Sequence, residues 1–185
     1  MVVRQTVLPT HLLKHVNRNK HIMNENTATY EGGCTCGHVR YQAHPKPLIV
    51  HCCHCRWCQR QTGASFALNA LYEAVLVQLT HGEVEELEVA SSSGNGQVIA
   101  RCPKCRIAVW SNYHMGGLRE RVRFLRVGTL DNPDLLPPDV HIFTSTKQPW
   151  VVLPPDAHAV EEFYDIQSTY SAESLKRREA LTNTP

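Results

Sequence analysis

Three short stretches decide the fold: CTC at residues 34–36, CCHCRWC at residues 52–58 and CPKC at residues 102–105. They contain all eight cysteines of the 185-residue chain. Thiolates two or three residues apart can converge on one zinc ion, because a short loop turns both sulfurs inward to Zn–S distances of about 2.3 Å. Disulfides at such spacings would close strained small rings. The grouping therefore predicts zinc sites rather than disulfides.

The composition is that of one globular domain with short tails, with 42% hydrophobic and 19% charged residues. A formal net charge of +2, with acids and bases interspersed, makes nucleic acid an unlikely partner. No stretch approaches the roughly 18–20 consecutive apolar residues of a membrane span, and no apolar signal segment opens the chain. We expect a cytoplasmic protein that does not bind membranes.

The chain divides into an N-terminal extension (1–29), a zinc domain (30–165) and a C-terminal helical tail (166–185). The extension is basic, and Thr10 is a weak candidate cap for a short amphipathic helix. It is expected to pack on its own domain or on a neighbouring subunit, which leaves a homo-oligomer open. In the tail, SAESLKRREALT (171–182) predicts one exposed terminal helix.

Runs of β-branched and aromatic residues predict a mainly β domain built of antiparallel strands. Gly, Pro, Asn and Asp punctuate these runs, and SSSGNGQ (91–97) predicts a flexible hairpin turn. The expected strands are VRYQA (39–43), LIVHC (48–52), AVLVQL (74–79), VEELEVAS (84–91), QVIARC (97–102), AVWSNY (108–113), RVRFLRVGTL (121–130) and HIFTSTKQPWVVL (141–153).

A four-thiolate zinc clamp would stabilise antiparallel sheets that close poorly at their edges. Cys34 and Cys36, together with Cys102 and Cys105, suit this clamp because they lie on distant hairpins. Four thiolates leave no open coordination position and give a net charge of about minus two, which is typical of a structural site.

The central group predicts a different kind of site. Cys53, Cys55 and Cys58 supply three thiolates, and three ligands can leave one position open for a water, a carbonyl oxygen or a thiol. The chemistry implied is the making or breaking of a carbon–sulfur bond. Cys52 points to the opposite face of an expected strand, as a core thiol or as a fourth ligand. We therefore expect two zinc ions per chain.

These motifs resemble the glutathione-dependent formaldehyde-activating enzyme family, which also includes centromere protein V. The resemblance is carried by GGCTCGHVRY (32–41), HCCHCRWCQRQTGASF (51–66), RCPKCRIAVW (101–110) and HIFTSTKQPW (141–150), and it runs from about Tyr30 to Asp165. Arg106 departs from the family pattern, since a glycine usually follows the CPKC-type turn.

The resemblance implies a β-tent fold, a structural zinc on the first four cysteines and a catalytic zinc on Cys53, Cys55 and Cys58. It implies a carbon–sulfur lyase that forms or cleaves S-hydroxymethylglutathione or a related glutathione conjugate. One alternative is a non-catalytic zinc module that binds protein or nucleic acid, and another is a zinc enzyme for a different electrophile or thiol.

Four residues near the zinc loop are further candidates for the site. Arg56 and Arg60 lie at i and i+4 if a helical turn follows Cys55, and they are candidate partners for the carboxylates of glutathione. His51 and His54 flank the loop, as proton carriers or as hydrogen-bond partners of metal ligands.

Overall fold

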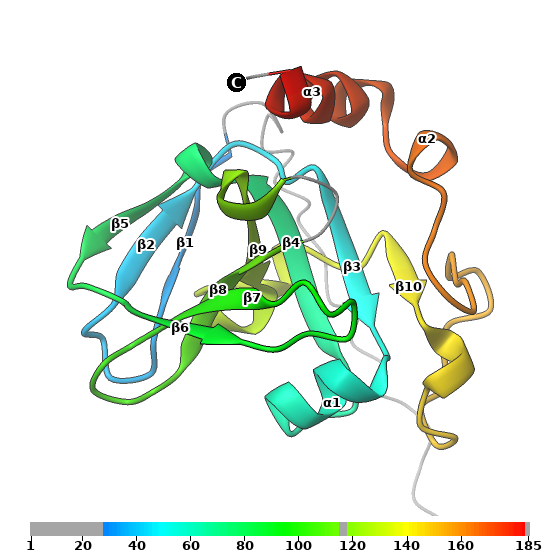
Figure 1. Ribbon diagram of the computed structural model, residues 1–185, viewed down its shortest axis with the longest axis horizontal. Coiled ribbons are helices and arrows are strands. Elements are labelled where there is room, and N and C mark those ends of the chain that lie inside the picture. The colour runs from blue at the N-terminus through cyan, green and yellow to red at the C-terminus, as the bar shows by residue number, and fades with distance from the viewer. Residues whose placement is uncertain (1–27, 115–117, 184–185) are drawn as a thin grey trace, which may run out of the picture.

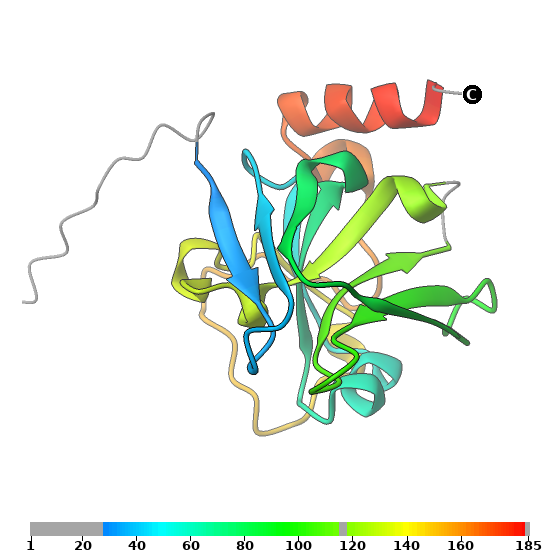
Figure 2. The same ribbon diagram turned by 90° about the vertical axis from the view of Figure 1, so that its left-hand side faces the viewer.

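The computed structural model describes residues 28–114 and 118–183, and the helix expected after Thr10 lies outside them. Strands of the described part form two sheets, and the mainly β prediction is confirmed (Figures 1 and 2). The smaller sheet has the order β1-β2-β5 and consists of Tyr30–Gly33 (β1), Arg40–Ala43 (β2) and Val77–His81 (β5).

The larger sheet has the order β10-β3-β4-β9-β8-β7-β6. Its neighbouring strands run antiparallel except β3 and β10, which are parallel. In sheet order its strands are Val140–Ile142 (β10), Ile49–Cys53 (β3), Ala67–Glu73 (β4), Val122–Arg126 (β9), Ala108–Tyr113 (β8), Gln97–Arg101 (β7) and Glu85–Val89 (β6).

The main hydrophobic core lies between the two sheets. It joins Tyr41 of β2 to Tyr72, Trp110 and Leu125 of β4, β8 and β9, all of them almost completely buried. The rings of Tyr41 and Trp110 meet edge to face at 6.0 Å. This arrangement suits the ring quadrupoles and adds to the burial of apolar surface.

A second core covers the other face of the larger sheet, where Ile49 and Leu71 pack against Tyr164 and Leu181 of the C-terminal segment. This segment contains two helices, Ile166–Thr169 (α2) and Ala172–Asn183 (α3), and α3 lies along one end of the sheet (Figure 1). The side-chain oxygen of Ser171 caps α3 by accepting from the backbone N–H of Ser174 at 3.1 Å.

The terminal helix predicted over 171–182 is confirmed as α3, and a shorter helix, α2, precedes it. Most residues of α3 are exposed, as expected, but one of its faces is docked on the domain. Arg177 donates to both carboxylate oxygens of Glu73, at 2.7 and 2.6 Å, and to the carbonyl of Lys46 at 2.9 Å. Together with the packing of Leu181, this ion pair holds the helix against the end of β4.

The structure departs most from the expected strands at 74–79, 121–130 and 141–153, and the sequence did not predict β1 and β4. The strand expected over 121–130 ends at Arg126, where a 3₁₀ turn at Val127–Thr129 follows. Residues 74–76 form a 3₁₀ turn, because the chain leaves the large sheet at Glu73 and enters the small one at Val77. The strand expected over 141–153 ends at Ile142, since Phe143 has a left-handed φ of 55° that breaks the extended backbone. The turn at 91–97 is confirmed, and it joins β6 to β7.

None of the helices in the described residues is both long and apolar enough to cross a bilayer.

Candidate functional site

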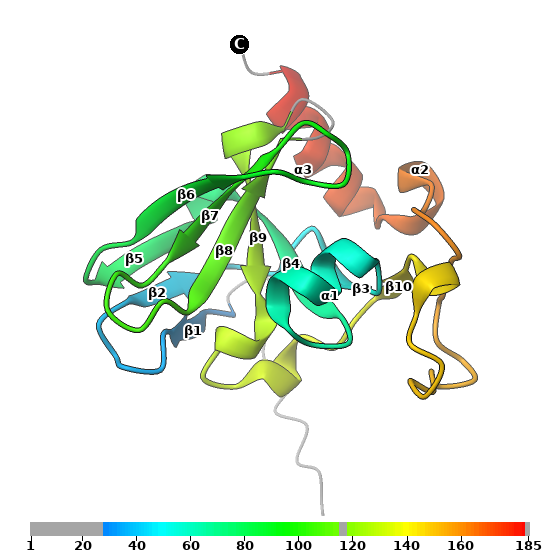
Figure 3. The ribbon, with the colours of Figure 1, turned by 60° about the horizontal axis from the view of Figure 1, so that its bottom comes forward.

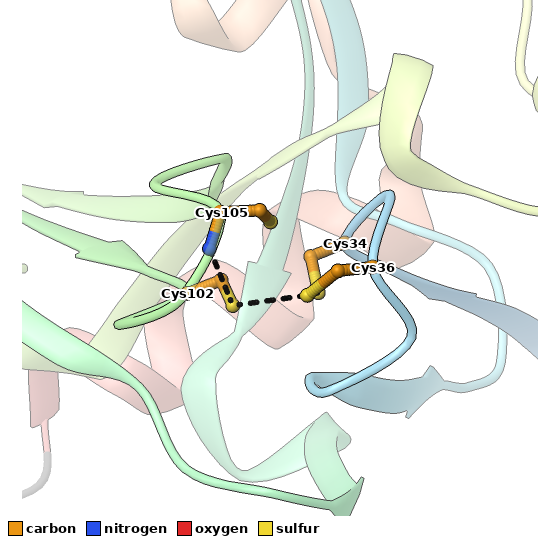
Figure 4. A group of neighbouring side chains, drawn as sticks. All are labelled: Cys34, Cys36, Cys102 and Cys105. Atoms are coloured by element: carbon orange, nitrogen blue, oxygen red, sulfur yellow. Dashed lines mark hydrogen bonds between the residues drawn. The ribbon is translucent and has the colours of Figure 1, made fainter.

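Four cysteines from two distant turns meet between the sheets (Figure 4). Cys34 and Cys36 lie in the turn between β1 and β2, and Cys102 and Cys105 lie in the turn between β7 and β8. Their sulfurs all lie within 4.8 Å of one another, with Cys34–Cys36 and Cys36–Cys102 separations of 3.5 and 3.7 Å. Sulfurs in a tetrahedral zinc site at 2.3 Å lie about 3.8 Å apart, so this donor set fits zinc.

Backbone N–H groups also point at these sulfurs. Val39 N donates to the sulfur of Cys34 at 3.2 Å, and Lys104 N donates to the sulfur of Cys102 at 3.4 Å. Hydrogen bonds lower the pKa of the Cys105 thiol to about 6, first from the backbone N–H of Ile107. Such contacts stabilise thiolates, the form in which cysteine binds a metal.

Arg106 follows this turn with a φ of 65°, which is the left-handed conformation expected where a glycine usually stands. Its N–H donates to the carbonyl of Cys102 at 3.0 Å, and its guanidinium pairs with Glu85. Glu85 also accepts from Arg101 at 3.0 Å. The turn therefore forms with arginine in place of glycine, at the cost of backbone strain.

Cys53, Cys55 and Cys58 form a second cluster, built by a strand end and a helix start. Cys53 ends β3, and Cys55 caps the helix Arg56–Thr62 (α1), which follows directly in the chain and lies at the end of β3 (Figures 1 and 3). The sulfur of Cys55 accepts from the N–H of Cys58 at 3.3 Å, and the three sulfurs lie within 4.8 Å of one another. Hydrogen bonds from Cys53 first, then from Cys58, lower the pKa of the Cys55 thiol. These residues could hold a second metal ion.

This cluster lines a pocket of about 460 Å³. The size lies within the 300–1,000 Å³ typical of small-molecule sites. Its surface is mostly apolar, although polar side chains also line it, and no carboxylate from the described residues does. The lining aromatic residues are Trp57, Tyr113, Phe124, Phe143 and Phe163, and its larger polar side chains are His51, Gln61, Asn69, Gln97 and Arg126.

Arg126 is the cation of this pocket. It donates to the amide oxygens of Asn69 and Gln61 at 2.8 and 2.7 Å, and its Nε has no partner among the described residues. Burial lowers its pKa, while the thiols of Cys58 and Cys53 act in the opposite direction. Both amides are neutral, so the positive charge of Arg126 has no carboxylate partner among the described residues.

His51 and His54 lie on opposite faces of the strand. His51 lines the pocket, between the rings of Phe124 and Tyr164 at 5.8 and 6.2 Å, and burial lowers its pKa to about 4. Its Nδ1 has no hydrogen-bond partner among the described residues. His54 comes three positions after His51, and side chains an odd number of positions apart on an extended chain point to opposite faces. The side chain of His54 therefore faces away from the pocket. Of the two, only His51 lines the three-cysteine pocket.

Arg56 and Arg60 lie on α1, as the helical-turn hypothesis requires, but they line a different hollow. Both are exposed, and Arg56 donates to Gln59 at 2.9 Å. Their role in substrate binding stays a prediction. Sequence reasoning did not identify Arg126, although its position in the alternating run RVRFLRVG (121–128) placed it on one face of a strand.

Cys52 does not join the three-cysteine cluster. It is buried on the other face of β3, in a group with His54 and His141. The core position expected for this thiol is what the structure has, although histidines rather than apolar groups alone surround it.

The chain is mainly β, with one cysteine cluster that joins its two sheets and another in the wall of a pocket. By their donor sets, both clusters could hold a metal ion. The family model described as "glutathione-dependent formaldehyde-activating enzyme" matches residues 29–146, and the chain belongs to this family. Among solved structures, a crystal structure of a Rhodobacter sphaeroides protein from the Northeast Structural Genomics effort is similar, at 17% identity and a TM-score of 0.43. The match covers 58% of this chain and 96% of that one. No curated protein matches the chain.

Proposed function

We propose that the chain is a zinc-dependent carbon–sulfur lyase that forms and cleaves adducts between an aldehyde and a small anionic thiol of the glutathione type. The observation that carries the proposal is the pocket in whose wall the three sulfurs of Cys53, Cys55 and Cys58 lie beside the cation of Arg126. Membership of the family supports the same reaction class.

The reaction balances without a further reactant. In the forward direction the thiol sulfur bonds to the carbonyl carbon, and the thiol proton passes to the carbonyl oxygen, which becomes the hydroxyl of the adduct. In the reverse direction the carbon–sulfur bond breaks, and the proton returns to sulfur. When bound, a zinc ion on the three cysteines would supply a Lewis acid with a position for the substrate's sulfur or hydroxyl.

The chain's own residues bind and orient the substrate. Arg126 offers an unneutralised guanidinium to a substrate carboxylate, held in place by Asn69 and Gln61. His51 lines the pocket, and its buried Nδ1 has no hydrogen-bond partner among the described residues, so this ring is the one that would hydrogen-bond the adduct's hydroxyl. The aromatic side chains give the pocket an apolar wall, and a polar contact made against such a wall is stronger than the same contact in water.

The test is the interconversion of glutathione and formaldehyde with S-hydroxymethylglutathione, followed by exchange NMR with the zinc-loaded full chain. The expected result is a rate above that of a protein-free blank, lost in Cys55→Ser while the circular dichroism spectrum of the variant stays native. An unchanged rate in Cys55→Ser, or no acceleration by the wild-type chain, would remove the proposal for this substrate.

A further inference from the structure

A third group of metal-binding side chains lies on the face of β3 opposite the three-cysteine pocket. It consists of Cys52, His54 and His141, whose sulfur and ring nitrogens lie within 4.8 Å of one another. We propose that these three residues bind a zinc ion of their own, separate from the two cysteine-only clusters and independent of the proposed reaction.

The backbone brings the three side chains together. β3 and β10 are parallel, and His141 lies directly opposite Cys52 in their register. Residues that face each other across a sheet point to the same side, and so do residues two apart on one strand. His54 follows Cys52 by two positions, and its N–H continues the ladder by donating to the carbonyl of Ile142 at 2.9 Å. The register of the sheet therefore builds this group.

The two histidines are already at a separation close to that of a metal site. Nε2 of His54 lies 3.0 Å from Nδ1 of His141, with the rings nearly parallel at an interplanar angle of 24°. Two nitrogens on one tetrahedral zinc, each at 2.0–2.1 Å, lie about 3.3 Å apart. The two nitrogens now share a hydrogen bond, so the ion would replace the shared proton and both rings would turn to direct their lone pairs at it.

The imidazole of His54 is also incompletely satisfied. Its ring is fully buried, at 0% exposure, and its Nδ1 has no hydrogen-bond partner among the described residues. Buried polar atoms are rarely left in this state without a ligand, an ion or water. This nitrogen lies on the far side of the ring from Nε2, so the donor set and the strand register carry the proposal, and this atom does not.

The donor chemistry selects the metal. One thiolate and two imidazoles suit zinc, and three protein ligands leave a fourth position for water. His141 is only partly buried, which provides a route from solvent to the group. The ion would join β3 to β10 across 87 positions of the chain. It would thereby fix the strand that carries His51 and Cys53 on its other face.

The competing interpretation is a buried histidine pair with a core thiol beside it, and it predicts no ion. We would strip the full-length chain with a chelator, saturate it with ¹¹³Cd²⁺ as the probe and record the ¹¹³Cd NMR spectrum. The chemical shift separates all-sulfur donor sets from mixed sulfur–nitrogen ones. The expected result is a mixed-donor resonance that added zinc displaces, whatever the sulfur-only sites show.

Variants assign that resonance to its residues. It is expected to disappear in Cys52→Val and His141→Gln and to remain in His158→Gln, a matched change at an exposed histidine. A saturated wild-type spectrum without a mixed-donor resonance would overturn the proposal even if the variants failed to fold. Survival of the resonance in both Cys52→Val and His141→Gln would overturn it as well. The exchange assay with glutathione and formaldehyde is a separate measurement, so failure of one proposal does not imply failure of the other.

Discussion

Two single substitutions, Cys36→Ser and Cys58→Ser, separate a metal cross-link from ordinary packing of cysteines. Cys36 is exposed, whereas Cys58 is half-buried. Without metal, Cys36→Ser should alter the free energy of unfolding by no more than about 0.5 kcal/mol, and Cys58→Ser should lower it by more. With zinc bound at both clusters, we expect Cys36→Ser to be the more destabilising of the two substitutions.

The magnitude follows from the two loops that the ions close. Cys36 and Cys102 are 66 positions apart, while Cys53 and Cys58 are five apart. The entropy of closing a loop grows as (3/2)RT ln n, so the longer loop restrains the unfolded chain by about 2 kcal/mol more. For a chain of this size, that difference lowers the Tm of Cys36→Ser by about 4–8 °C more than that of Cys58→Ser.

The assay is urea unfolding of the zinc-loaded chain, followed by circular dichroism and repeated in excess chelator. In chelator both variants should approach the stripped wild-type protein, and Cys36→Ser should be the more stable of the two. The reasoning is refuted if Cys58→Ser is the less stable variant both with zinc and without it, because burial alone would then explain the data.

Three other changes have definite expected outcomes. Arg126→Gln should raise KM for an anionic thiol about ten- to a hundredfold, because a charge-assisted contact is worth about 1.5–3 kcal/mol. Steady-state kinetics would measure this, and a larger rise of KM in Arg60→Gln would instead place the substrate's carboxylate on the exposed face of α1. Arg106→Gly should raise the free energy of unfolding by about 0.5 kcal/mol. The change relieves about 1 kcal/mol of strain from the left-handed backbone, which exceeds the loss of the exposed ion pair with Glu85. A lower urea midpoint in the variant would contradict this. Arg177→Met should destabilise the fold by about 3 kcal/mol, because it leaves the carboxylate of Glu73 buried without its cation. Adding Glu73→Gln should recover part of that loss, and a double variant as unstable as the single one would argue against the ion pair.

Local patterns predicted most of the fold because they reflect local physics. Short spacings between cysteines, such as Cys53 to Cys58, allow convergence whatever the rest of the chain does. The glycines at 94 and 96 take positive φ values of 79° and 78°, and the hairpin turn forms where they stand. By contrast, the 3₁₀ turn at 74–76 depends on the passage from one sheet to the other, which alternation within a single strand does not encode.

The parts of the site that the sequence did not predict depend on contacts between distant strands. Arg126 reaches Gln61 and Asn69 across 65 and 57 positions, and His141 reaches His54 across 87. Only the sheet order shows that these residues are neighbours. Arg56 could be predicted as a site residue because it lies within the cysteine stretch. In the structure it lines a different hollow from the three-cysteine pocket, so proximity in sequence was not sufficient.

The stretch CCHC at 52–55 shows why adjacency in sequence misleads in a strand. Cys52 and Cys53 are consecutive, yet they point to opposite faces, so the motif supplies donors to two clusters rather than one. Cys53 continues into the loop and helix that carry Cys55 and Cys58, whereas Cys52 depends on β10 for its partners. The pocket cluster is therefore local and the second one is built by strand pairing. A change that shifts β10 against β3 would disrupt the Cys52 group while leaving the three thiols of the pocket together.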